Sequence, residues 1–368
     1  MIADLSKLNI GYVGYSDNLE HPADRRRLAS WAQDRQVTLN TSRPLESDLL
    51  VMTNAANFKY WVKRANQPII LDLVDGYLGE NPWLAKDVAR NILRSLSGAS
   101  TLGWLTYTRH LKFACQNSNA VVVASIEQKR LVEHLNPNVW VIQDNHVEID
   151  LEREIQHDSV FKSKKHLFWE GLGYTLKHFK VIAGELDSFL FKEGWGLYLL
   201  TVEEFPRWGA KYGKVKTKKL IESMFPLAHK QITVIPWTIN NLVAYSKVSD
   251  FAIIPINPND KFALLKPENK LLSMWHLGLP TLCSVTPAYK RLENELASFK
   301  FCVELKDWHK ALLDFASKDK EWNMSKVAIN KFIQSKHSNS HVTDQWELVI
   351  RDVISNQNSN SDSDGMLR

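Results

Sequence analysis

Residues 250–284 read DFAIIPINPNDKFALLKPENKLLSMWHLGLPTLCS, and this stretch predicts a strand, a helix and a second strand in that order. The apolar run 251–256 ends at a turn-rich segment and is typical of a strand buried on both faces. Pro267 suits the first position of a helix, where its missing N–H costs nothing, and Gly278 suits the helix end. A short strand follows at 280–284. This succession predicts a right-handed crossover within a parallel sheet.

The pattern Lys-x-x-Asn-Lys-Leu-Leu, followed by a helix and Gly-Leu-Pro, resembles the donor-binding unit of GT-B glycosyltransferases. It is most similar to the group 1 class (glycosyltransferase family 4-like) that builds bacterial surface polysaccharides. In that class the helix start and a lysine hold the donor diphosphate, which suits the positive end of a helix dipole. The alternative is that Lys266 and Lys270 are ordinary solvated residues at the start of a helix. The resemblance implies donor-binding roles for Lys266, Glu268, Asn269, Lys270 and Ser273.

One part of the family pattern differs in this sequence. Many members carry two glutamates in this unit, the first facing the sugar and the second binding the nucleotide ribose. Those places fall here on Leu265 and Ser273, and Glu268 lies nearby but out of register. The resemblance therefore implies the fold and the use of a nucleotide-sugar, and it leaves open the donor sugar and whether the reaction retains or inverts.

The length and composition indicate a soluble protein of two domains. The chain has 368 residues, 44% of them hydrophobic and 24% charged, and no apolar run approaches the length of a membrane span. The N-terminus lacks a basic start followed by an apolar core, so we expect no secretory signal and a cytoplasmic location. The basic clusters 25–27 and 214–219 favour anionic lipid or phosphate. We therefore also expect peripheral contact with the cytoplasmic face of the inner membrane.

The charge and the cysteines exclude two other classes of partner. A net charge of +5 and a pI near 8.9 are too weak for a dedicated nucleic-acid binder, so we expect no nucleic-acid partner. Cys115, Cys283 and Cys302 stand singly in apolar contexts without metal-ligand spacing. We expect buried thiols and no metal site.

The first loop of the chain carries candidate phosphate-binding residues. Gly14 ends the first predicted strand, and Arg25, Arg26 and Arg27 open the helix that follows. Loops after the carboxyl ends of strands line the ligand crevice of a doubly wound sheet, so this loop should reach the acceptor or a phosphate. We expect Gly14, Arg25 and Arg26 to take part. The alternative is that all three arginines are solvated.

Candidate catalytic residues lie at two later strand ends of the first half. Asp72 and Asp75 follow a buried strand, and a carboxylate there could accept the proton of an acceptor hydroxyl. The alternative is that Asp75 begins a turn and Asp72 caps a helix. His146 occupies the place where the resemblance puts the crossover between domains, and it could orient a hydroxyl or phosphate or be purely structural.

Two loops of the second half complete the predicted donor site. The segment after the strand at 166–169 brings Gly171 and Gly173 between a strand and a helix, where backbone amides can approach a phosphate or the donor sugar. Tyr174 lies in this loop, and Lys177 is the single match to a basic pair that the family often has there. Trp237 follows a strand where the family holds the nucleobase, and it could stack on the base or belong to the core.

The alternation of strands and helices predicts an α/β fold with two doubly wound Rossmann-like domains that face a cleft. The resemblance implies GT-B architecture, with a C-terminal helix crossing back. The predicted boundaries are an acceptor-side domain at 1–150, a linker at 151–165, a nucleotide-sugar-binding domain at 166–340, a crossing helix at 341–354 and a disordered tail at 355–368.

The resemblance and these loops together indicate a metal-independent glycosyltransferase. It would move a sugar from a nucleotide-activated donor, a UDP- or GDP-sugar, to a hydroxyl of a surface glycan or a lipid-linked precursor; no bound cofactor is expected. One alternative is a nucleotide-sugar epimerase or an activated polyol-phosphate transferase of the same fold. Another is a non-catalytic subunit that binds nucleotide-sugar.

Overall fold

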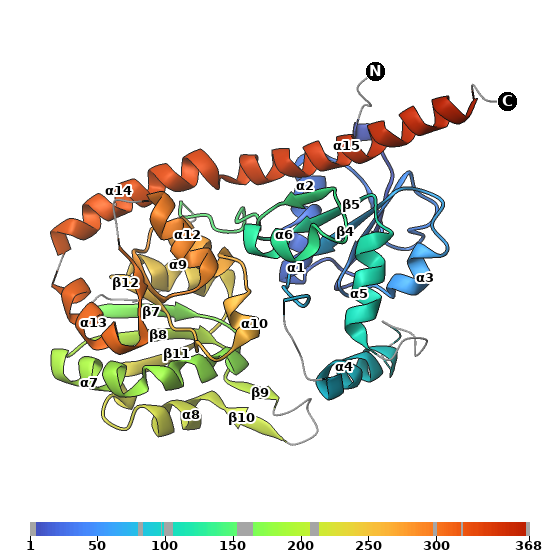
Figure 1. Cartoon of the computed structure of the whole chain (residues 1–368). Helices are drawn as coiled ribbons and strands as arrows, with labels where there is room; N and C mark the ends of the chain where they lie inside the picture. Colours follow the sequence, from blue (N-terminus) through green and yellow to red (C-terminus); the bar gives the residue numbers. More distant parts are fainter. Residues whose placement is uncertain are drawn as a thin grey trace. The chain divides into compact units, whose positions relative to one another are not determined.

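The computed structural model describes residues 5–79, 84–96, 98, 106–152, 165–206, 213–296, 300–317 and 319–365. Contacts divide the chain into two units (Figure 1). The first unit comprises residues 1–147, 265–267 and 337–368, and the second comprises 148–264 and 268–336. Most of the predicted linker at 151–165 lies outside the described residues.

The first unit is built on a parallel sheet with the strand order β2-β1-β3-β4-β5-β6. Its strands are β1 (Ile10–Val13), β2 (Leu39–Asn40), β3 (Leu49–Thr53), β4 (Ile69–Leu73), β5 (Ala120–Val123) and β6 (Val139–Val141). Its helices are η1 (Leu5–Lys7), α1 (Pro22–Arg25), α2 (Leu28–Asp34), α3 (Phe58–Val62), α4 (Leu84–Leu96), α5 (Tyr107–Gln116), α6 (Ile126–Val132) and α15 (Asn339–Gly365).

The second unit repeats this architecture with the strand order β11-β8-β7-β12-β13-β14, all parallel. Its strands are β7 (His166–Glu170), β8 (Gly196–Thr201), β11 (Ile232–Pro236), β12 (Phe251–Ile254), β13 (Thr281–Ser284) and β14 (Cys302–Val303), with a separate antiparallel hairpin of β9 (Glu204–Pro206) and β10 (Lys214–Lys216).

The helices of the second unit include three short segments, of three or four residues each, that the sequence did not predict. They are η2 (Gly173–Val181), α7 (Ala183–Glu193), α8 (Thr217–Met224), η3 (His229–Gln231), α9 (Ile239–Lys247), α10 (Lys261–Leu264), α11 (Asn269–His276), α12 (Pro287–Leu296), η4 (Leu305–Asp307), α13 (Trp308–Ala316) and α14 (Asp319–Lys336). The 3-10 segment η2 stands where one continuous helix was expected, and α10 precedes α11.

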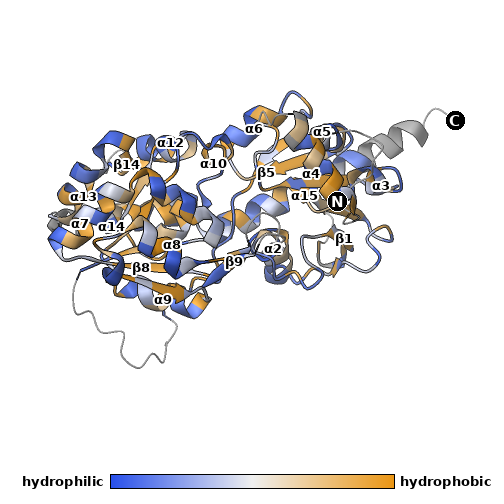
Figure 2. Cartoon of the chain, turned by 90° about the horizontal axis from the view of Figure 1, so that it is seen from below, coloured by the Kyte–Doolittle hydropathy of each residue, from blue (hydrophilic) through white to orange (hydrophobic). Residues whose placement is uncertain are grey.

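The strands are apolar because helices cover both faces of each sheet. β3 and β8 are buried at every residue, and Figure 2 shows hydrophobic residues concentrated in the strands. The unit at 250–284 has the predicted order of β12, α11 and β13, with Gly278 at φ +72° ending the helix. Both predicted doubly wound sheets are therefore confirmed. Pro267 does not take the predicted first position of the helix, because α11 begins at Asn269 after the N-cap Glu268.

The C-terminal helix α15 belongs to the first unit, as the predicted crossing helix requires. It packs beside α2 (Figure 1), and its buried residues Val342, Trp346, Val349, Ile350 and Val353 share a core with strand residues such as Ile10 and Val122. The helix runs to Gly365, whereas the sequence predicts a tail without structure from Ser355. No proline interrupts this polar stretch and its first glycine is Gly365, and the helix continues beyond Val353, which is still part of this core.

We expect replacement of Trp346 by alanine to destabilise the protein by roughly 3–5 kcal/mol, because the side chain is fully buried in the first unit. Leu348→Ala on the same helix is the matched control, since Leu348 is exposed and should change stability by about 0.5 kcal/mol or less. Denaturant unfolding of both variants measures the difference. Equal stabilities would show that α15 is not part of this core.

Candidate active site

The order of strands in the second sheet locates its ligand edge. Strands β8 and β11 lie on one side of β7, and β12, β13 and β14 lie on the other, so the strand order reverses between β7 and β12. In open α/β sheets, ligands bind outside the carboxyl ends of the strands where the order reverses. The residues that follow β7, β8, β11 and β12 are therefore the candidates in this unit.

Glu170, at the carboxyl end of β7, connects three of the predicted residues. Its backbone oxygen accepts a hydrogen bond of 2.7 Å from Lys270 Nζ, on the first turn of α11. Its carboxylate accepts one of 3.2 Å from the indole Nε1 of Trp237, which follows β11. The ammonium group of Lys270 also lies 4.7 Å from the ring centroid of Trp169. The structure therefore gathers Gly171, Lys270 and Trp237 around a glutamate that the sequence analysis missed.

The two predicted glycines are required by close packing. A Cβ on Gly171 would lie 2.7 Å from Lys270 Nζ and 2.8 Å from the ring of Trp169. A Cβ on Gly173 would lie 2.3 Å from the ring of Phe205. The N–H of Gly171 already donates to the oxygen of Leu200, so this amide helps to hold the sheet. The absence of a side chain at Gly171 is what lets Lys270 reach Glu170.

Two buried oxygen atoms near this edge have no hydrogen-bond partner among the described residues. One is Oγ1 of Thr201, the last residue of β8, and the other is Oδ1 of Asn269, the first residue of α11. Buried polar atoms in folded proteins are nearly always paired, so such atoms at a ligand edge are suited to a bound hydroxyl or N–H. Asn269 was predicted, and Thr201 was not.

Three other predicted donor-site residues bind neighbours within their own unit. Lys177 forms an ion pair of 2.6 Å with Asp260, and although burial alone would raise the pKa of this carboxyl, the hydrogen bond from Lys177 holds it below its usual value. Glu268 is buried and accepts from Arg291 at 2.6 Å. Ser273 donates from its hydroxyl to the oxygen of Asn269, one turn earlier. These contacts give each residue a structural role as well as any role toward a ligand.

Two further predicted residues lie differently. Tyr174 is exposed, and its ring is not part of a described core. Lys266 is half-buried on the loop between α10 and α11, and contacts assign its segment, 265–267, to the first unit.

In the first unit, Asp72 belongs to a buried ion pair. Arg27 Nη2 and Nε donate to its carboxylate at 2.6 and 2.9 Å, and Arg27 Nη1 donates to the oxygen of Ile142 at 2.8 Å and to Asp144 at 3.3 Å. Arg27 and Asp72 have no exposed side-chain surface. Burial raises the pKa of the Asp72 carboxyl and Arg27 counteracts this rise, while the pKa of Arg27 itself is raised by the two aspartates against the cost of burial. This pair connects the start of α2, β4 and the chain after β6.

The triple arginine was predicted to divide between phosphate contact and solvent, and the structure divides it differently. Arg27 is internal, whereas Arg25 and Arg26 are half-buried. Arg25 donates to the backbone oxygen of Glu20 at 2.7 Å. The buried position of Arg27 fits neither the solvated alternative nor contact with a phosphate. Its spacing of four residues from the buried Trp31 is the signal that could have placed it inside.

Gly14 lies against a second buried carboxylate. Asp24 accepts hydrogen bonds from the hydroxyl of Tyr12 at 2.7 Å, from the backbone N–H of Tyr15 at 2.9 Å and from that of Ser16 at 3.0 Å. A Cβ on Gly14 would lie 2.9 Å from an oxygen of Asp24. The loop after β1 is therefore held by an internal acceptor, and Gly14 is needed for this closure.

The remaining predicted residues of the first unit differ in exposure. Asp75 is half-buried after β4, and His146 is buried, with its backbone N–H bonded to Asn339 Oδ1 at 2.8 Å. Asn54, which directly follows β3, was missed: both polar atoms of its buried amide have no partner among the described residues. β1 and β3 flank the strand-order reversal of this sheet, so Asn54 lies at its ligand edge.

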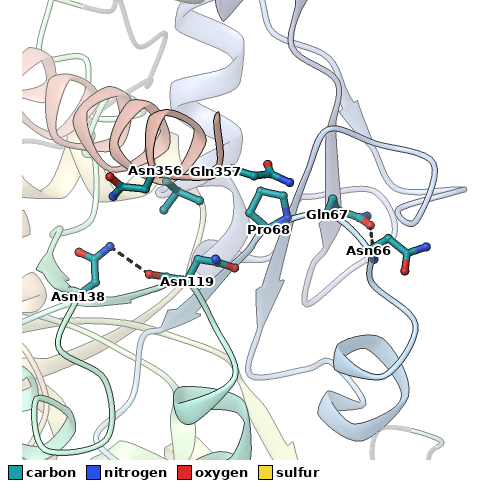
Figure 3. Close-up of a pocket in the computed structure, with 8 residues that line it drawn as sticks. Asn66, Gln67, Pro68, Asn119, Asn138, Asn356 and Gln357 are labelled. Atoms are coloured by element: carbon teal, nitrogen blue, oxygen red, sulfur yellow. Dashed lines mark hydrogen bonds between the residues drawn. The ribbon is translucent and has the colours of Figure 1, made fainter. Parts of the chain in front are cut away.

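A cavity of about 310 Å³ lies at the opposite, amino edge of the first sheet (Figure 3). Its lining consists of Asn66, Gln67, Pro68, Asn119, Asn138, Val353, Asn356 and Gln357. Several of these amides support the fold, since Asn119 Oδ1 accepts from the N–H of Ile69 and Asn138 Nδ2 donates to Asp352. None of the predicted site residues lines this cavity.

Within the part of the chain that the structure describes, no cluster of three His, Cys, Asp or Glu side chains could hold a metal ion. No described helix is both long and apolar enough to cross a bilayer.

The sequence matches no protein-family model, and a search of curated proteins finds no match either. Solved structures do match. TarM has 11% identity and a TM-score of 0.55 over 81% of this chain and 53% of its own, and the GtfA/B complex has 9% identity and a TM-score of 0.55 over 83% and 57%. An E. coli trehalose-6-phosphate synthase bound with UDP-2-fluoro glucose has 12% identity and a TM-score of 0.56 over 84% and 74%.

These neighbours are GT-B glycosyltransferases, and at such low identity the likeness shows the shared fold alone. The chain has the GT-B fold. It spans little more than half the length of TarM and of the GtfA/B chain that it matches. One TarM structure, of a mutant of the S. aureus protein, is described in complex with fondaparinux, α-GlcNAc-glycerol and UDP. The predicted fold class is confirmed by this comparison.

We expect Asp72→Asn to cost roughly 3–5 kcal/mol of stability, because it leaves the buried Arg27 without its main counter-charge. Replacing both partners, as Arg27→Met with Asp72→Leu, should recover much of that loss. Asp75→Asn is the control and should melt within a few degrees of the wild type. Thermal unfolding of the three proteins tests this, and an Asp72→Asn protein as stable as the wild type would show that the pair is not structural.

Gly171→Ala should destabilise the protein by roughly 1–3 kcal/mol, because the new methyl group must displace Lys270 or the packed ring of Trp169. Gly184→Ala in α7 is the matched control. A Cβ there meets nothing within 4 Å, so we expect a gain of about 0.5–1 kcal/mol from reduced freedom of the unfolded chain. Denaturant unfolding compares the two, and the same sign for both variants would contradict the described packing.

Proposed function

We propose that this protein is a glycosyltransferase that moves a sugar from a nucleotide-activated donor to a hydroxyl group. The observation that carries the proposal is the arrangement at the carboxyl edge of the second sheet. There the ammonium group of Lys270, the start of α11 and the indole of Trp237 converge on Glu170 beside a glycine. The GT-B fold supports this proposal by analogy, because neighbours with that fold are glycosyltransferases and one is bound with a UDP-sugar.

The leaving group of such a reaction is a nucleoside diphosphate, and this edge suits it. The first turn of α11 offers backbone N–H groups and the positive end of a helix dipole, and Lys270 adds a full charge. Lys270 Nζ donates to the backbone oxygen of Glu170, a group without formal charge, at 2.7 Å. Lys266 would add a second cation. Stabilisation of the diphosphate by these groups is the basis for proposing a metal-independent reaction.

The other donor contacts follow from the same edge. Trp237 would contact the nucleobase, while the unpaired oxygen atoms of Thr201 and Asn269 would accept hydrogen bonds from donor hydroxyls or the base. Glu170 would hold Trp237 and Lys270 in place rather than react. Gly171 and Gly173 would allow the donor to approach the backbone of this loop.

On the acceptor side we propose the first unit, with Asp75 as the group that accepts the proton of the attacking hydroxyl. Asp75 is preferred over Asp72, because Asp72 is engaged by Arg27 in a buried pair. Asn54, His146, Arg25 and Arg26 would orient the acceptor or its phosphate. We further propose a UDP- or GDP-sugar as donor and a surface glycan or a lipid-linked precursor as acceptor, with action at the cytoplasmic face of the inner membrane.

A thermal-shift experiment with UDP, GDP, CDP, ADP and dTDP tests the donor class. A nucleotide at a hundred times its dissociation constant should add about 2.7 kcal/mol of stability. In Lys270→Ala and in Lys266→Ala the affinity should fall about tenfold or more, because a charge-assisted hydrogen bond to the diphosphate is lost. Lys218→Ala, at an exposed position on α8, is the matched control and should bind as the wild type does.

If no nucleotide stabilises the wild type, the donor site is wrongly assigned. If a nucleotide binds equally well to Lys270→Ala and Lys266→Ala, the diphosphate lies elsewhere. Release of the nucleotide from a bound nucleotide-sugar upon addition of acceptor, abolished in Asp75→Asn with binding intact, would separate an enzyme from a subunit that only binds.

A further inference from the structure

Helix α4 of the first unit packs with its polar side inward. Asp87 and Asn91 are buried, and the carboxylate of Asp87 accepts from the backbone N–H of Thr108, at the start of α5, at 3.2 Å. This contact satisfies one of the N–H groups that every helix start leaves unpaired. The polar side of α4 is therefore committed to the protein interior.

Two arginines on the same helix fix its rotation about its axis. Arg94 donates to the backbone oxygen of Asn54 at 2.6 Å and lies 4.7 Å from the ring centroid of Tyr107. Arg90 lies 4.9 Å from the ring centroid of Tyr77. With Asp87, Arg90, Asn91 and Arg94 all turned toward the protein, the opposite side of α4 must face outward.

The outward side of α4 is apolar. Its exposed residues are Ala85, Ala89, Ile92, Leu93 and Leu96, and the last three are 45%, 68% and 81% exposed. Their spacing places all five on one stripe of the helix surface. A surface helix normally turns such a stripe to the core, whereas α4 turns its polar side to the core and its apolar side outward. An exposed apolar stripe of this kind marks an interaction site.

The sequences of α3, α4 and α5 are strongly basic. By sequence, α3 with the two residues after it, α4 and α5 contain eight Lys or Arg (Lys59, Lys63, Arg64, Lys86, Arg90, Arg94, Arg109 and Lys112). They contain one acidic residue, Asp87, which is buried. The whole chain has a net charge of only +5, so the rest of the sequence is slightly acidic. The positive charge of the protein is concentrated on these three helices, which belong to one unit (Figure 1).

We propose that α4 is a membrane-surface helix whose apolar stripe inserts into the interface of an anionic bilayer. An exposed apolar stripe in a unit that also exposes basic residues, here Lys63, Arg64, Arg109 and Lys112, is suited to bind in the plane of such a surface, through buried apolar area and attraction to acidic headgroups. The basic clusters expected from the sequence to favour lipid or phosphate were 25–27 and 214–219; Arg27 of the first is internal, the lysines of the second are exposed, and α4 is a further candidate that the sequence analysis did not name. This inference does not depend on the glycosyltransferase proposal.

Co-sedimentation of the full chain with vesicles tests this helix. We expect binding to vesicles of phosphatidylcholine with phosphatidylglycerol, and much weaker binding to phosphatidylcholine alone. Leu93→Ser with Leu96→Ser should weaken binding at least about tenfold, because two exposed apolar side chains no longer insert. Arg109→Gln with Lys112→Gln should weaken binding to the anionic vesicles alone, by about fivefold for each charge.

The matched control is Leu227→Ser with Val327→Ser, at positions 54% and 70% exposed in the second unit, which should bind as the wild type does. Thermal unfolding checks that all variants remain folded, and no nucleotide is present. Binding of the Leu93, Leu96 double variant equal to that of the wild type would overturn the proposal. So would self-association in ultracentrifugation that this double variant alone abolishes, because the stripe would then be a contact between copies of the chain.

Discussion

Both sheets consist of parallel strands covered by helices on both faces, and this arrangement decides where polar chemistry can lie. Strands such as β3 and β8 are buried along their whole length, so they carry apolar side chains. Groups that meet a ligand must come from the ends of strands and from the loops that follow. Asp72 lies inside its strand, and there a buried arginine neutralises it. Glu170, Thr201 and Asn54 lie at or just beyond strand ends.

This constraint explains why the sequence predicted the fold well and the site in part. The runs that form β4, β5 and β12 are apolar and end at turn residues, so the sheet could be assigned without tertiary information. The same logic located the loops that hold Gly171 and Trp237. It could not identify Glu170, because a single glutamate after an apolar run looks like any solvated residue until its partners are known.

Pairing over long distances in sequence limited the rest. Arg27 and Asp72 are separated by 45 positions, and nothing local distinguishes Arg27 from Arg25 and Arg26 except its spacing to a buried tryptophan. Lys177 and Asp260 are 83 positions apart. Glu268, just before α11, accepts from Arg291 of α12, and β13 lies between these two helices in the sequence. Ion pairs of this kind depend on the folded topology. The predicted roles of Lys177 and Glu268 toward a donor therefore remain predictions.

The membership of α15 in the first unit has a consequence for biosynthesis. A ribosome makes residues 1–147 before the second unit, yet the core of this first unit includes Trp346 and Val349 from α15, which follows the second unit in the sequence. The second unit, whose last residue is Lys336, is fully synthesised earlier. The first unit must thus wait, with one face of its sheet covered only in part by η1 and α2, until α15 has been synthesised. Chaperone demand during translation should therefore fall on the domain that emerges first.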